Sequence, residues 1–141
     1  MQQTFPFLLT SAVTVLAIIF YIFSTYRVTL MRGKHKIEAP MMTGHQEFER
    51  AVRVQTNTLE AMPIFLPALW LATVYFKPLG WFPGAVGVLW IAGRIIYMQG
   101  YMTAPSRRSV GFGISALAQV LLLVLAIIGL VLTWANAITT S

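Results

Sequence analysis

Residues 47–63 read EFERAVRVQTNTLEAMP, a polar stretch that leads directly into an apolar segment. The stretch holds three of the chain's four acidic residues and two of its ten basic residues. Ionisable groups at the edge of a bilayer are costly, so they generally serve a function. The stretch therefore predicts both the place where a helix enters a membrane and the place where a polar site is built.

The composition is that of a membrane protein. Of the 141 residues, 57% are hydrophobic and 10% are charged, and the mean hydropathy is +0.74. A soluble domain carries about 25% charged residues. The length fits a single domain that covers residues 1–141.

The polar residue types exclude several kinds of chemistry. The chain has no cysteine, which excludes disulfides, thiolate nucleophiles and protein-bound iron–sulfur clusters. His35 and His45 fall in one polar loop without metal-ligand spacing, so we expect solvated side chains and no metal site. The net charge of +6 comes from basic residues in short loops between apolar runs, which is not the pattern of a nucleic-acid-binding protein.

Four apolar runs predict an all-α integral membrane protein, a bundle of four transmembrane helices that run up, down, up and down. The runs cover residues of about 5–26, 47–76, 81–102 and 109–134. The first run lacks a basic start and a cleavage site, so we interpret it as a retained helix. Gly33 is expected to help break the helix in the first loop, and Pro63 and Pro67 are expected to bend the second helix.

The distribution of charge predicts the orientation. The first and third loops hold nearly all of the loop charge, whereas the second loop holds only Lys77. Basic loops stay in the cytoplasm, so loops one and three are expected there and both termini on the opposite side. A bacterial inner membrane and an endoplasmic reticulum follow the same rule, and both remain open.

Two polar helix faces are expected to meet near the cytoplasmic boundary, because the second helix enters there and the third helix returns there. The first face carries Arg53, Asn57 and Glu60, and the second carries Arg94, Tyr97 and Tyr101. The spacings of i, i+3 or i+4, and i+7 put each set on one side of a helix, over about 10 Å. Arg32, Arg107 and Arg108 are expected at the same level.

The residue types of these faces indicate a small zwitterionic ligand with additional carboxylates. Arginine pairs with carboxylates in bidentate geometry, and Glu60 would suit an ammonium group. Two structural alternatives remain: Arg53, Glu60 and Arg94 could form internal ion pairs, and the two tyrosines could belong to an interfacial aromatic belt.

Two motifs resemble those of a known family, the membrane-associated proteins in eicosanoid and glutathione metabolism (MAPEG). Residues 47–60 follow the pattern EFERxxRxQxNxxE, and residues 94–101 follow RxxYxQGY. The order of the four helices matches over essentially the whole chain. The first motif is closer to the branch of microsomal glutathione transferases and leukotriene C synthase than to that of prostaglandin E synthase.

The resemblance implies a homotrimer that binds bent glutathione between neighbouring subunits. It assigns glutathione binding to these residues: Arg53, Gln55, Asn57, Glu60, Arg94, Tyr97, Tyr101 and Arg32. It assigns stabilisation of the glutathione thiolate to Arg108, with the adjacent Arg107 as the alternative. It implies glutathione as the co-substrate and no metal.

The function expected from these residues is glutathione transfer to lipophilic electrophiles that arrive through the lipid, with peroxidase activity on lipid hydroperoxides as an additional activity. The alternatives are a non-catalytic lipid-binding scaffold of the same family and a small multidrug transporter. Two departures from the family pattern are Ala61, where an aromatic residue is common, and Gly33, where leukotriene C synthase has a second arginine. The latter favours a general transferase.

Overall fold

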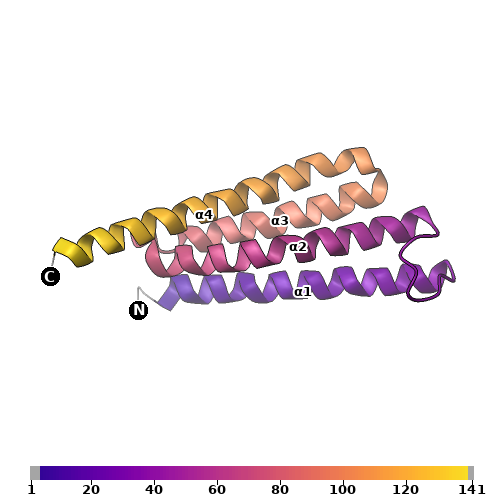
Figure 1. Ribbon diagram of the computed structural model, residues 1–141, viewed down its shortest axis with the longest axis horizontal. Helices are drawn as coiled ribbons and strands as arrows, with labels where there is room; N and C mark the ends of the chain where they lie inside the picture. Colours follow the sequence, from indigo (N-terminus) through magenta and orange to yellow (C-terminus); the bar gives the residue numbers. More distant parts are fainter. Residues whose placement is uncertain (1–3, 140–141) are drawn as a thin grey trace.

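The structure is a computed structural model that describes residues 4–139, with Pro105 described by its backbone alone. These residues form four long antiparallel helices (Figure 1). The elements in chain order are α1 (Thr4–Lys34), α2 (Gln46–Tyr75), α3 (Phe82–Thr103), the short 3-10 turn η1 (Pro105–Arg107) and α4 (Arg108–Thr139). Over the described residues, the all-α prediction is confirmed.

Three of the helices, α1, α2 and α4, are long and apolar enough to cross a membrane. The remaining helix, α3, carries Arg94 and Gln99 among its 22 residues and does not reach the same hydropathy. The α1–α2 and α3–α4 connections lie at one end of the bundle, while the α2–α3 turn, the start of α1 and the end of α4 lie at the other (Figure 1). The two basic loops therefore share one end (Figure 1), as the up-down topology predicts, and their cytoplasmic location stays a prediction.

Two helix boundaries differ from the sequence-based expectation. Helix α1 continues past residue 26, where its apolar run ends, and stops at Lys34, one residue after Gly33. A glycine inside a helix costs only about 1 kcal/mol, and Arg32 and Lys34 in the last turn favour helix continuation through the helix dipole. Helix α4 likewise runs past residue 134 to Thr139. Helix α2 keeps its expected span with Pro63 and Pro67 inside it, and the expected bend at these prolines stays a prediction.

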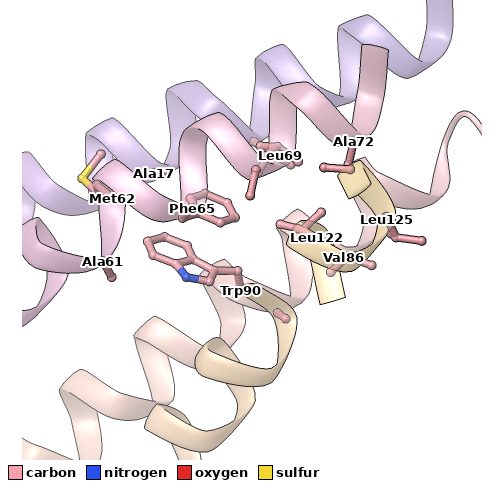
Figure 2. Close-up of a cluster of buried hydrophobic side chains, with 14 residues drawn as sticks. Ala17, Ala61, Met62, Phe65, Leu69, Ala72, Val86, Trp90, Leu122 and Leu125 are labelled. Carbon is pink, nitrogen blue, oxygen red and sulfur yellow. The ribbon is translucent and has the colours of Figure 1, made fainter. Parts of the chain in front are cut away.

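The core contains one close aromatic pair between α2 and α3. Phe65 and Trp90 are both fully buried, and their rings stack with centroids 3.8 Å apart at 5° (Figure 2). Leu122 of α4 and Ala17 of α1 complete the same cluster. All four helices therefore contribute to one core.

The outer surface is apolar over most of its length. Ile22, Leu117 and Trp134 are 60%, 68% and 69% exposed, respectively, and belong to a large set of exposed apolar side chains on all four helices. A soluble monomer rarely exposes apolar surface of this extent, whereas lipid would cover it.

Candidate functional site

A pocket of about 530 Å³ opens between α2, α3 and α4 near the end that holds the basic loops. The predicted meeting of two polar helix faces is observed here. The lining residues are Arg53, Thr56, Asn57, Glu60, Tyr97, Tyr101, Arg108, Ser109 and Phe112.

Helix α2 presents its polar face because its apolar face is buried. Val54, Thr58 and Ala61 are buried, which turns Arg53 and Glu60 outward as exposed side chains. Neither of these two charged groups, nor Arg94, has an ion-pair partner within 4.0 Å among residues 4–139. The alternative of internal ion pairs among these residues is therefore not supported, and their charges remain available to a ligand.

Arg94 of α3 is held by an amide and two aromatic rings. Its side chain is 3% exposed. Nη1 donates a 2.9 Å hydrogen bond to Asn57 Oδ1 of α2, and the guanidinium lies 5.2 Å from the Trp90 ring centroid and 5.5 Å from that of Tyr97. Buried Nε has no hydrogen-bond partner within the described chain. Arg94 lines a smaller adjoining cavity of about 180 Å³ that shares Asn57 and Glu60 with the main pocket.

The two tyrosines lie in the pocket wall rather than in an outer aromatic belt. Tyr97 is 3% exposed, and its ring centroid lies 5.6 Å from that of Tyr101. The Arg108 guanidinium lies 5.5 Å from the Tyr101 ring centroid. The α3 face and the start of α4 are thus coupled by a cation–π contact.

Close helix contact brings Arg108 to this wall. A Cβ atom on Gly111 would lie 2.1 Å from Tyr97 N, and one on Gly93 would lie 2.7 Å from Ser115 N. Small residues allow helix backbones to approach in this way. The start of α4 therefore lies directly against α3. Arg108 lines the pocket, and Arg107 does not.

Besides Arg94, which lines the smaller cavity, two residues from the predicted set lie outside the main pocket. Arg32 Nη1 donates to the carbonyl oxygens of Met41 and Glu38 at 2.9 and 3.2 Å, and Gln55 Nε2 donates to Tyr21 Oη at 2.9 Å. Both side chains therefore serve contacts within the α1–α2 part of this subunit. Their assignment to glutathione stays a prediction.

The sequence analysis missed three lining residues, Thr56, Ser109 and Phe112. The position of Phe112, one turn after Arg108 at i+4, was a usable signal. Thr56 lies three residues after Arg53 and four before Glu60, so the same spacing indicated it as well. Ser109 adjoins Arg108 and had no such signal.

A second pocket of about 580 Å³ continues the first toward the α1–α2 loop. It shares Arg53, Thr56 and Tyr101 with the first pocket and adds polar residues that include Glu49 and Arg50. Together the two pockets form a polar route from the loop end of the bundle to Arg108.

His45 is exposed, as expected for a loop histidine, whereas His35 is partly buried and the two side chains contact each other. His35 and His45 stack with ring centroids 3.6 Å apart, and His35 Nε2 lies 2.9 Å from Glu47 Oε2. The reason is that α1 extends to Lys34, which brings the loop histidines against the first turn of α2. The possible ligand atoms of the three residues lie within 4.8 Å of one another. However, the Lys34 ammonium is 2.6 Å from the same Glu47 oxygen, which opposes a bound cation.

Comparison with known proteins decides the family. The model of the MAPEG family matches residues 10–128, a range that includes every lining residue of the main pocket. The chain belongs to the MAPEG family. The resemblance of the two motifs is thereby confirmed.

Among MAPEG relatives, the chain is 39% identical over 128 residues to microsomal glutathione S-transferase 2 of Mus musculus, covering 91% of this chain and 86% of the relative. It is 36% identical over 125 residues to leukotriene C4 synthase of Cavia porcellus, covering 86% and 80%. An uncharacterized protein of Synechocystis sp. is 38% identical over 118 residues, covering 84% and 85%. These relatives support a membrane function related to glutathione.

Proposed function

We propose that this protein is a membrane-bound glutathione transferase that activates the glutathione thiol for attack on lipophilic electrophiles. The observation that carries the proposal is the pocket between α2, α3 and α4, where Arg53 and Arg108 converge and no described protein carboxylate pairs with either. Glutathione is a tripeptide with two carboxylates, one ammonium group and one thiol. Its charges match the unpaired groups of the pocket.

Binding follows from charge and hydrogen bonding. Arg53 pairs with a carboxylate of glutathione in bidentate geometry, and Glu60 receives the ammonium group. Asn57, fixed by Arg94, offers its amide hydrogens to the peptide. In a homotrimer, Arg32 and Gln55 of a neighbouring subunit would add contacts from α1 and α2. Glutathione enters through the polar route from the loop end, which the charge pattern puts in the cytoplasm.

Arg108 acts on the thiol. A free thiol has a pKa of about 8.5, and a neighbouring cation lowers it. The thiol proton leaves to water, and the Arg108 guanidinium, which stays charged, stabilises the thiolate. The thiolate sulfur then forms a bond to the electrophilic carbon, and with an aryl chloride, chloride departs with the bonding pair.

The second substrate comes from the apolar side. Phe112 forms part of the pocket wall next to Arg108, and the surfaces of α1 and α4 are apolar along their length. A lipophilic electrophile dissolved in the bilayer thus reaches the thiolate without crossing water. The same thiolate would attack the terminal peroxide oxygen of a lipid hydroperoxide. The O–O bond breaks, and the lipid alkoxide leaves and takes up a proton to become the alcohol. The glutathione sulfenic acid then condenses with a second glutathione to give glutathione disulfide and water, and this peroxidase activity is assayed in parallel.

The test is glutathione-dependent conjugation of a chromogenic aryl chloride by the purified protein in detergent. Wild-type protein is expected to form the conjugate, and Arg108→Ala is expected to lose about a hundredfold or more in turnover. The matched control is Arg107→Ala, which should retain activity. Absence of conjugate with wild-type protein would contradict the proposal and favour a lipid-binding scaffold or a transporter.

A further inference from the structure

A separate cavity of about 590 Å³ lies at the opposite end of the bundle from the glutathione pocket. It is built where the start of α1 meets the α2–α3 turn, at the end of the bundle where α4 also ends (Figure 1). Its lining residues are Phe5, Pro6, Phe7, Thr73, Lys77, Gly80 and Trp81.

Lys77 is the one charged residue in this lining. All four acidic residues of the chain fall between positions 38 and 60, which belong to the other half of the bundle. Within residues 4–139, Lys77 has no ion-pair partner. A single ammonium group therefore lies at the rim of this cavity without a counter-charge from the described residues.

The walls around Lys77 are apolar. Phe5, Phe7 and Trp81 are 60%, 40% and 49% exposed. The hydroxyl of Thr73 is hydrogen-bonded to Leu69 O and Thr10 Oγ1, each at 2.8 Å. It is therefore satisfied within the protein, and the wall suits contact with an acyl chain. Gly80 packs closely on Pro6, since a Cβ atom at Gly80 would lie 3.1 Å from Pro6 Cγ. This contact closes one side of the cavity.

The cavity lies where a bilayer boundary is expected. The apolar parts of α1 and α2 end beside it, and exposed aromatic rings such as Trp81 are typical of the membrane–water interface. A ligand with an anionic group at the boundary could pair with Lys77, and its acyl chain, deeper in the bilayer, could pack against the aromatic walls.

We propose that this cavity binds an anionic phospholipid, with its headgroup phosphate on the Lys77 ammonium and one acyl chain against Phe5, Phe7 and Trp81. The binding is independent of the glutathione pocket, since the two cavities share no lining residue. A bound lipid would fill the gap between the start of α1 and the α2–α3 turn, and would thereby stabilise that end of the bundle.

Native mass spectrometry of the detergent-solubilised protein tests the proposal. The protein is mixed with equal amounts of phosphatidylglycerol and phosphatidylcholine that carry identical acyl chains. Wild-type protein should retain the anionic lipid about fivefold better, the preference that one interfacial lysine supplies. Lys77→Gln should lose this preference, and the matched control Lys36→Gln, on the loop at the other end, should keep it.

Two results with the lysine variants would overturn the proposal: an unchanged preference in Lys77→Gln, or an equal loss in Lys36→Gln, which would indicate unspecific attraction.

A second variant, Phe7→Ala, should weaken retention of both lipids while keeping their ratio, and unchanged retention would show that no acyl chain lies in the cavity. Added inorganic phosphate should displace neither lipid. Displacement of phosphatidylglycerol by inorganic phosphate would assign the site to the free anion instead.

Discussion

The side chains of Arg94 and Asn57 join α3 to α2 beside the pocket, through a hydrogen bond of 2.9 Å from Arg94 Nη1 to Asn57 Oδ1. A buried guanidinium generally has a carboxylate partner, but here an amide and two aromatic rings surround it. The positive charge of Arg94 is therefore not cancelled within the described part of the chain. It adds to the field that attracts an anionic ligand into the neighbouring pocket.

Asn57→Ala should lower stability, because it removes the described hydrogen-bond partner of buried Arg94. Leaving a buried polar group unsatisfied costs about 1–3 kcal/mol. The measurement is thermal unfolding in detergent without glutathione. The exposed Gln99 of α3 provides the control, since Gln99→Ala should leave the midpoint nearly unchanged. Equal midpoints for both variants would mean that the contact to Arg94 contributes nothing.

Gly111→Ala should separate α4 from α3 and reduce activity. The added Cβ atom would lie 2.1 Å from Tyr97 N, a backbone atom that cannot move away alone. Overpacking of this kind costs about 1–3 kcal/mol, and the displacement carries Arg108 away from Tyr101.

Gly113 provides a control in the same helix, two residues further on. No atom lies within 4 Å of its added Cβ atom, and alanine is the better helix former by about 1 kcal/mol. Gly113→Ala should keep activity and keep or raise the unfolding midpoint. If both variants lose activity alike, the close contact at Gly111 does not position Arg108.

Phe65→Ala should destabilise the bundle by about 3–5 kcal/mol. The ring is fully buried and stacks on Trp90, so its removal leaves a cavity between α2 and α3 (Figure 2). The adjacent Ile64 is 53% exposed, and Ile64→Ala should cost far less. Unfolding in detergent compares the two variants, and a similar loss for both would argue against the stacked pair as the centre of the core.

Arg53→Ala and Glu60→Ala should each weaken glutathione binding by about tenfold to a hundredfold, the loss of one charge-assisted hydrogen bond. Neither charged group has an ion-pair partner in residues 4–139. Each substitution therefore removes a ligand contact and leaves no oppositely charged protein group without its partner. Titration calorimetry in detergent measures the affinity. Full affinity in both variants would mean that glutathione binds elsewhere.

The sequence alone predicted the all-α class and the meeting of the two polar faces. Residues that are three, four or seven positions apart lie on the same face of a helix, so their spacing predicts which side chains lie together. Asn57 and Glu60 reach the main pocket for this reason. Periodicity could not predict that Gln55 bonds Tyr21 of α1, since that contact depends on the rotation of α1 against α2.

Other parts of the site depended on tertiary contacts that have no local signal. Arg107 and Arg108 are equivalent by composition, and the 3-10 turn η1 together with the contact at Gly111 decides which of them faces the pocket. The histidine stack was missed because α1 extends to Lys34, beyond residue 26, where the apolar run ends.

Rapid mixing with detection of thiolate absorbance tests the central proposal most directly, because it records glutathione ionisation on the protein before any electrophile is added. Wild-type protein mixed with glutathione near neutral pH should show a rise in thiolate absorbance and release one proton per thiolate formed. Arg108→Ala should bind glutathione without that rise, and Arg107→Ala should behave as wild type. Full thiolate formation by Arg108→Ala would contradict the proposed role of Arg108 at the thiol.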